Sequence, residues 1–230
     1  MSTQLAGRIV GGLFLAAFVV YITGGALVDS VAGADGALTR VADHPGRVAA
    51  GALLMALNCA IVLTIGVLAL PVLRPHGEVS AHAYLAGRVV EAVLLAVGVL
   101  FLLLLIPLSR EHGQAGADAG VVLSSLGRVA VEANRYSYQL AMVTVAVAGV
   151  VFCRTLRRAR LVPRPLATWG AAGYAIFAVG AVLEVAGYRV GLVLAVPGGL
   201  FEVVFGLFVL VRGFPAARLP QPSAPAVVAG

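Results

Sequence analysis

The chain has 230 residues, of which 61% are hydrophobic and 11% are charged, and its mean hydropathy is +1.03. A soluble domain usually carries about a quarter charged residues and about half apolar ones. The polar side chains of this chain are too few to coat a water-soluble surface. The composition therefore excludes an ordinary soluble domain and indicates that lipid surrounds most of the chain.

The basic residues and the cysteines exclude further classes of function. All 16 basic residues are arginine, and without a lysine amine the chain cannot form a retinal or pyridoxal Schiff base. The formal net charge is +6, but membrane proteins concentrate arginine in their cytoplasmic loops, so we do not expect nucleic acid as a partner. Cys59 and Cys153 each lie in an apolar stretch without metal-ligand spacing.

Long apolar stretches define the expected fold. A membrane-spanning helix needs about 20 mostly apolar residues. Six stretches qualify, at about residues 9–28, 48–73, 85–108, 136–152, 166–187 and 190–211. The sequence therefore predicts an all-α, polytopic transmembrane bundle of six spans, which forms one domain over residues 1–214. The Pro-rich tail, residues 215–230, is expected to be disordered and cytoplasmic.

The distribution of arginine predicts how the chain crosses the membrane. With a cytoplasmic N-terminus, ten arginines fall on the inner side and six on the outer side. The connector at residues 154–165 carries five of the ten, which are Arg154, Arg157, Arg158, Arg160 and Arg164. We therefore expect an N-in/C-in topology. The bias toward Ala, Val, Leu, Gly and Arg is typical of a GC-rich genome and favours a bacterial cytoplasmic membrane.

Three charged residues inside the expected spans form the candidate ligand-binding site. An ionisable group within a span costs about 2.5–3.5 kcal/mol on insertion scales, so such groups usually face protein or water and have partners. Arg88 and Glu91 are three residues apart and share one helix face near the inner end of the third span. Glu202 lies near the middle of the sixth span without a neighbour of opposite charge, and Pro197 is expected to kink its helix. The alternative is that these charges only pack helices together.

A second charged set lies near the outer side. Glu132, Arg135 and Glu184 are expected to form structural ion pairs between the fourth and fifth spans. The four histidines lie in connectors on different sides of the membrane, and no third ligand accompanies the pair that shares a loop, so no metal site is predicted. No catalytic motif is found, and no catalytic residue or cofactor is predicted.

A Gly-Arg-aliphatic tripeptide recurs along the first half of the chain. Its arginines, Arg8, Arg47, Arg88 and Arg128, are separated by 39, 41 and 40 residues. Either an ancient unit has been duplicated, or one span plus one connector takes about this length and arginine marks each membrane interface.

Several short pieces resemble a known family. They are Arg8-Ile-Val-Gly11, Tyr84-Leu-Ala-Gly-Arg88-Val-Val-Glu91, Leu161-Val-Pro-Arg-Pro-Leu-Ala-Thr-Trp169-Gly170 with Gly173-Tyr174, Pro197-Gly198 with Glu202, and Arg212-Gly213-Phe214. In this order and spacing they resemble the bacterial six-helix membrane proteins of the domain-of-unknown-function family four-three-eight-six. The resemblance implies a single membrane domain of six spans and singles out Arg88, Glu91 and Glu202. It implies no activity.

Two functions remain compatible with these residues. In the first, the protein binds or moves a small molecule, ion or lipid through a mid-membrane polar site. In the second, it is a non-catalytic membrane partner or regulatory protein whose buried charges only lock helix packing. The expected partners are the lipid bilayer and one such ligand, with a homo-oligomer left open. An enzyme is the less favoured alternative, because general acid–base catalysis would need a second group near Glu202, and Glu91 is the one plausible candidate.

Overall fold

The computed structural model describes residues 2–33, 36–188 and 190–215, and within these ranges the chain is helical without any β-strand. The elements in chain order are α1 (Thr3–Ala32), α2 (Ala37–Asp43), α3 (Pro45–Leu73), η1 (Arg74–His76), α4 (Glu78–Leu103), α5 (Leu105–Gln114), α6 (Ala117–Arg158), α7 (Arg164–Val185), η2 (Gly191–Leu194) and α8 (Val196–Arg212). The predicted all-α fold is confirmed. The tail expected to be disordered lies, from residue 216 onward, outside the described residues.

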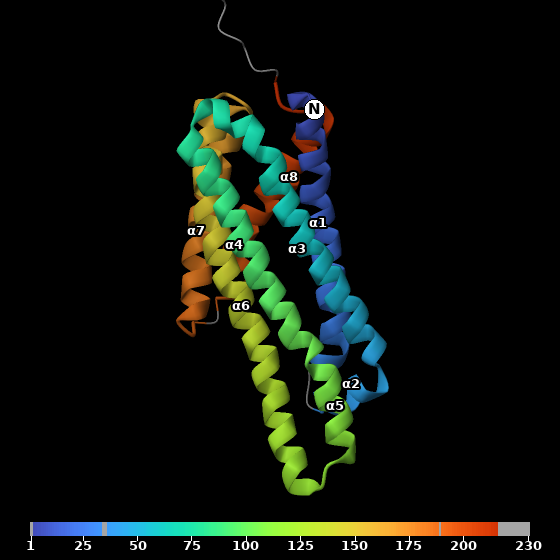
Figure 1. The fold of residues 1–230 in the computed structure, drawn as a ribbon. Coiled ribbons are helices and arrows are strands. Elements are labelled where there is room, and N and C mark those ends of the chain that lie inside the picture. Colours follow the sequence, from blue (N-terminus) through green and yellow to red (C-terminus); the bar gives the residue numbers. More distant parts are fainter. Residues whose placement is uncertain (1, 34–35, 189, 216–230) are drawn as a thin grey trace, which may run out of the picture.

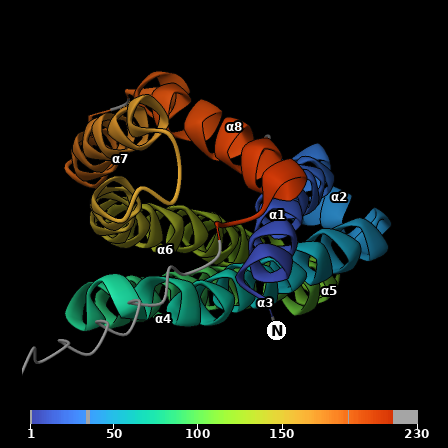
Figure 2. The ribbon, with the colours of Figure 1, turned by 90° about the horizontal axis from the view of Figure 1, so that it is seen from above.

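The six longest helices pack as a closed ring (Figures 1 and 2). Around the ring, α1 packs on α3, α3 on α4, α4 on α6, α6 on α7, and α7 on α8. The last helix, α8, then packs back on α1 and closes the ring. The short helices α2 and α5 pack against each other at the end of the molecule away from the N-terminus.

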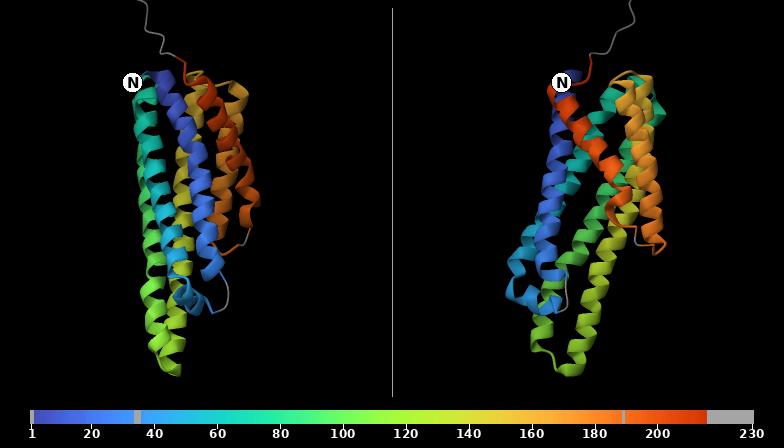
Figure 3. Two further views of the ribbon diagram at one scale, coloured as in Figure 1. Left: turned by 90° about the vertical axis from the view of Figure 1, so that its right-hand side faces the viewer. Right: turned by 180° about the vertical axis from the view of Figure 1, so that it is seen from behind.

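Helix α8 closes the ring by running obliquely between its two neighbours (Figure 3). At its start, a side chain added at Gly173 of α7 would meet the backbone of Gly198 at 3.0 Å. At its other end, a side chain added at Gly11 of α1 would collide with the carbonyl oxygen of Gly206. Glycines at these crossings let the helix backbones touch, as small residues do in membrane bundles.

Aromatic side chains fill the interior of the ring. Phe14 of α1 and Phe152 of α6 both contact the edge of Phe205 of α8, at centroid distances of 5.3 and 5.4 Å. Tyr84 of α4 stacks on Phe152 at 4.4 Å. Because these four rings come from four helices and each is at most 2% exposed, they tie opposite sides of the ring together.

Five helices are long and apolar enough to cross a membrane: α1, α3, α4 with α5, α6, and α7. The remaining ring helix, α8, has 17 residues. Leucine and valine side chains on the outside of the ring are widely exposed, such as Leu53 at 69% and Val211 at 70%. An apolar exterior around a packed interior is what a lipid-facing bundle requires.

The helices extend beyond the stretches predicted from hydropathy. The fourth stretch was predicted at residues 136–152, but α6 has 42 residues and begins at Ala117. Its polar first half remains helical because it packs on α2 and α5 (Figure 1). The third stretch is divided at Leu104 into α4 and α5. Pro107 has no N–H to donate to the carbonyl of Leu103, which explains a break one turn earlier.

Pro197 does not kink a continuous helix, which corrects the sequence prediction. It stands in the first turn of α8, where the missing N–H of proline leaves no helical bond unmade. The stretch expected to be helical from residue 190 instead contains η2, and α8 begins at Val196. Pro197 therefore starts the helix that carries Glu202.

The close approach of α1 and α8 can be tested with two glycines of α1. In Gly11→Ala, the new methyl group would push against the carbonyl of Gly206, so we expect the free energy of unfolding to fall by about 1–3 kcal/mol, the usual cost of overpacking. Thermal unfolding of the purified protein in mild detergent measures this loss. The matched control is Gly25→Ala, where an added methyl meets no atom within 4 Å and stability should be kept or raised. Equal losses in both variants would contradict the close crossing.

Candidate intramembrane polar site

Arg88 is held inside the ring by three neighbours. Arg88 belongs to α4, and its side chain is buried in the ring. Its Nη1 lies 2.9 Å from Oε2 of Glu91, one turn further along the same helix. Its Nε donates a hydrogen bond of 3.2 Å to the carbonyl oxygen of Val62 in α3. The guanidinium also lies 5.7 Å from the ring centroid of Phe14 in α1. Arg88 thus links three adjacent helices of the ring.

The approach of Arg88 to α3 depends on the glycine beside it. A Cβ atom at Gly66 would lie 2.8 Å from the Cβ atom of Arg88. Because Gly66 has no side chain, α4 comes close enough for the guanidinium to reach the carbonyl of Val62, which lies one turn earlier in α3. The buried cation therefore gains a backbone acceptor in addition to Glu91, as a buried charge requires.

Glu202 is bonded to a tyrosine of the neighbouring helix. The hydroxyl of Tyr174, in α7, donates a hydrogen bond of 2.5 Å to Oε1 of Glu202 in α8. Tyr174 itself is buried, and its ring contacts Phe201 edge-on with centroids 5.8 Å apart. A side chain at Gly149 of α6 would occupy the place of the Tyr174 ring. Three helices therefore fix the hydroxyl that holds the carboxyl group of Glu202.

Arg88 and Glu202 lie at about the same depth in the ring. Arg88 is ten residues from the first residue of α4, and Glu202 is ten residues from the last residue of α8. At a rise of about 1.5 Å per residue, both lie about 15 Å from the end of the ring where α4 begins and α8 ends. Among the described residues, no ion pair within 4.0 Å joins Glu202 to Arg88.

The three charged side chains do not balance one another. Arg88 contributes one positive charge, and Glu91 and Glu202 contribute two negative charges when both are ionised. Glu91 already pairs with Arg88, so the charge of Glu202 is left over. An uncompensated carboxylate in a low-dielectric interior is strongly unfavourable. Glu202 must therefore carry a proton or hold a positively charged group.

Three buried side-chain atoms of α3 and α4 have no hydrogen-bond partner among the described residues: Oδ1 of Asn58, the hydroxyl oxygen of Tyr84 and Oε2 of Glu91. Oε2 of Glu91 is ion-paired with Arg88. Tyr84 lies one turn before Arg88 in α4, and its side chain is 1% exposed. Buried polar atoms are nearly always hydrogen-bonded to protein or water. The hydroxyl of Tyr84 and Oδ1 of Asn58 would therefore each be stabilised by a polar partner.

The second predicted charged set also comes together. Nε of Arg135 lies 2.9 Å from Oε2 of Glu132 on α6, and its Nη1 lies 3.7 Å from Oε2 of Glu184 on α7. The guanidinium lies 5.2 Å from the ring centroid of Tyr136. These contacts join the middle of α6 to the last turn of α7, and they are partly exposed, so they are a means of packing two helices.

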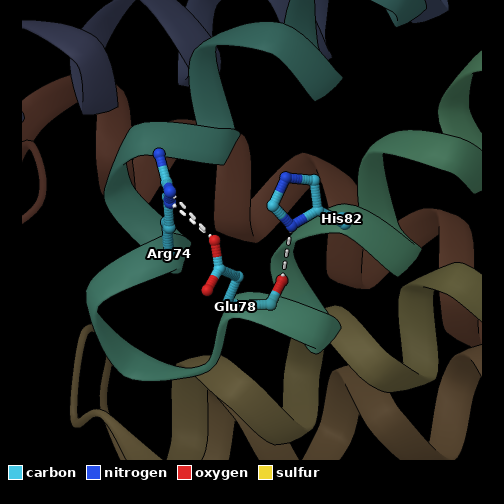
Figure 4. Close-up of polar contacts among 3 residues, drawn as sticks. All are labelled: Arg74, Glu78 and His82. Carbon is cyan, nitrogen blue, oxygen red and sulfur yellow. Dashed lines mark hydrogen bonds and ion pairs between the residues drawn. The ribbon is translucent and has the colours of Figure 1, made fainter.

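A surface ion pair near the start of α4 provides a contrast with the buried one. Nη2 of Arg74 lies 2.9 Å from Oε1 of Glu78, and both side chains are 63% exposed (Figure 4). His82 approaches the backbone oxygen of Glu78 through Nδ1 at 2.8 Å. Within the described residues, no group of three His, Cys, Asp or Glu side chains is arranged to hold a metal ion.

Sequence reasoning did not identify the partners of Glu202. Tyr174 was noted only as part of a family piece, and Tyr84 likewise, although both lie at the site. Their separation from Glu202 in the chain hides the relation, since Tyr174 precedes it by 28 residues. A local signal was present, because a tyrosine flanked by glycine within an apolar stretch is a hydroxyl that needs a partner.

Breaking the buried Arg88–Glu91 pair should cost much more stability than breaking the exposed Arg74–Glu78 pair. Arg88→Met leaves Glu91 buried without its cation, and we expect the free energy of unfolding in detergent to fall by about 3–5 kcal/mol. Combining it with Glu91→Met removes both charges and should restore most of this loss. Arg74→Gln breaks the exposed pair and should cost less than about 1 kcal/mol. An Arg88→Met variant as stable as Arg74→Gln would show that the buried pair does not hold the ring.

Comparison with known proteins gives one match. Neither the curated proteins nor the solved structures yielded a match to the chain. The family described as "Domain of unknown function (DUF4386)" matches residues 9–213. This range contains nearly all of the helical ring, together with Arg88, Glu91 and Glu202, and it confirms the resemblance found in the sequence. The chain belongs to the DUF4386 family.

Proposed function

We propose that this protein crosses a bacterial cytoplasmic membrane six times and binds a small cation or a protonated solute at Glu202. The sixth crossing would be α8, a mostly apolar helix whose 17 residues extend about 26 Å at the usual helical rise. The five arginines at residues 154–164 lie at the end of the ring where α1 begins and α8 ends, which supports the N-in/C-in topology.

The observation that carries the proposal is the incomplete bonding of the Glu202 carboxyl group. Its Oε1 accepts a hydrogen bond from Tyr174, whereas no described residue bonds to Oε2. The side chain is half-buried, so the second oxygen is not sealed by packing. A carboxyl group with one fixed and one free oxygen, in a site that lacks one positive charge, suits a proton or a small cationic group.

The orphan hydroxyl of Tyr84 extends this proposal to a solute with more than one polar group. Tyr84 lies on α4 and Glu202 on α8, so a molecule bonded to both would bridge opposite sides of the ring. Binding would then respond to the distance between these helices. A carrier needs such a link between occupancy and helix position.

The alternative function is a non-catalytic partner or regulator, in which the charges only lock the bundle. The complete burial of Arg88 and Glu91 and the aromatic filling of the ring favour it. It does not explain why the carboxyl group of Glu202 has a free oxygen, because a purely structural residue would have lost its charge or gained a second partner.

Native mass spectrometry of the protein purified in mild detergent tests the two functions. The wild-type protein should retain a co-purifying small molecule, and Glu202→Gln, which keeps the shape but removes the charge, should lower its occupancy at least about tenfold. Glu78→Gln, which changes an exposed glutamate at the surface, is the matched control and should leave occupancy unchanged. A ligand held equally by Glu202→Gln, or an empty wild-type protein, would favour the structural function.

A further inference from the structure

A group of arginines surrounds two hollows at the end of the ring where α6 and α8 end and α7 begins. One hollow, of about 440 Å³, is lined by Arg154, Arg157, Arg158 and Arg164. The other, of about 650 Å³, is lined by three arginines, Arg160, Arg164 and Arg212, and by apolar residues that include Phe208 and Leu161. Arg164 borders both hollows, so they form one continuous basic region, named here the arginine cluster (residues 154, 157, 158, 160, 164 and 212).

The arginine cluster lacks negative charges of its own. Residues 154–164 include no aspartate or glutamate. Among the described residues, the ion pairs found involve Arg74, Arg88 and Arg135, none of which belongs to the arginine cluster. The guanidinium of Arg212 lies 5.3 Å from the ring centroid of Phe208. Six exposed cations around a concave surface repel one another unless an anion occupies it.

Arg160 adopts a backbone conformation that its residue type disfavours. Its φ angle is 54°, which makes it the only non-glycine residue with positive φ among those described. It terminates α6 in the position that glycine usually takes, with the N–H of Leu161 bonded to the carbonyl of Leu156 at 3.0 Å. Glycine would form this turn with less strain. The presence of arginine here indicates that its guanidinium has a role that offsets the backbone strain.

Three neighbouring arginines also carry local costs. Arg164 is the first residue of α7, and a positive charge at a helix N-terminus opposes the helix dipole. Arg154 and Arg158 are four residues apart on α6, where like charges repel across one turn. The enrichment of arginine on the cytoplasmic side of membrane proteins does not require arginines at these costly positions, because arginines at other positions of the same connector would satisfy it equally well. These three local costs at one surface point to a bound anion that offsets them.

We propose that the arginine cluster binds the phosphate headgroup of an anionic phospholipid. Arginine recognises phosphate through paired N–H donors. The six arginines around the two hollows, of which Arg164 borders both, offer a site for one phosphodiester or two. The apolar residues of the larger hollow, Phe208 and Leu161, suit the glycerol and upper acyl carbons of a lipid, which a free phosphate ion lacks. Basic pockets at the ends of membrane helices commonly bind such headgroups.

The test is a lipid titration followed by native mass spectrometry of the full chain in mild detergent. The probes are phosphatidylglycerol and, with the same acyl chains, zwitterionic phosphatidylcholine. We expect the wild-type protein to retain phosphatidylglycerol preferentially, and Arg160→Gly and Arg164→Gln each to weaken its retention about fivefold. Arg74→Gln, at the same end but outside the arginine cluster, is the matched control and should retain the lipid as the wild type does.

Arg160→Gly separates lipid binding from folding. Glycine relieves the positive φ angle, so the unfolding temperature in lipid-free detergent should be kept or raised while lipid retention falls. Three results would overturn the proposal: equal retention of both lipids by the wild type, unchanged phosphatidylglycerol retention in both cluster variants, or competition by millimolar inorganic phosphate that removes the lipid completely. The last result would assign the arginine cluster to a soluble phosphate instead.

Discussion

The packing of the last ring helix on the first is the contact on which the rest of this structure depends. Without α8 against α1, the other ring helices would form an open row, and Glu202 would face lipid instead of the aromatic interior. The contact relies on Gly11 and Gly206, where the two backbones touch. Since lipid provides no hydrophobic force between helices, such van der Waals contact between small residues is what closes a ring in a membrane.

Closure also determines how charge is tolerated inside the ring. Arg88 pairs with Glu91 on its own helix, α4, but its backbone acceptor and its aromatic neighbour come from α3 and α1, so assembly of these helices adds to its stabilisation. Glu202 is likewise placed by α8 and held by α7. Each charge therefore favours the assembled ring over separated helices, because an unassembled helix would expose an unpaired charge to lipid. Assembly of the ring does not by itself balance the excess negative charge of Arg88, Glu91 and Glu202.

The sequence predicted those features that depend on lipid or on local spacing. Each ring helix appears as an apolar stretch, since lipid requires an apolar exterior whatever the helix packs against. The Arg88–Glu91 pair follows from a spacing of three residues on one helix. Helix ends were predicted less well, as in α6, whose polar first half continues the helix outside the apolar stretch. The bond from Tyr174 to Glu202 could not be predicted, because it depends on how α7 crosses α8.

The recurring Gly-Arg tripeptide shows how the same residues serve different roles. Arg88 is buried and bonded on three sides, whereas Arg8, Arg47 and Arg128 are exposed. A duplicated functional unit would be expected to use its arginines alike, so the recurrence is better explained by the regular length of one span plus one connector. Two arginines of residues 154–164 differ from both kinds, because Arg160 is exposed with a positive φ angle and Arg164 is exposed at a helix N-terminus. Arg88 and Glu91 offset each other inside the ring, whereas the exposed charges of the arginine cluster are offset, in our proposal, by an anionic lipid.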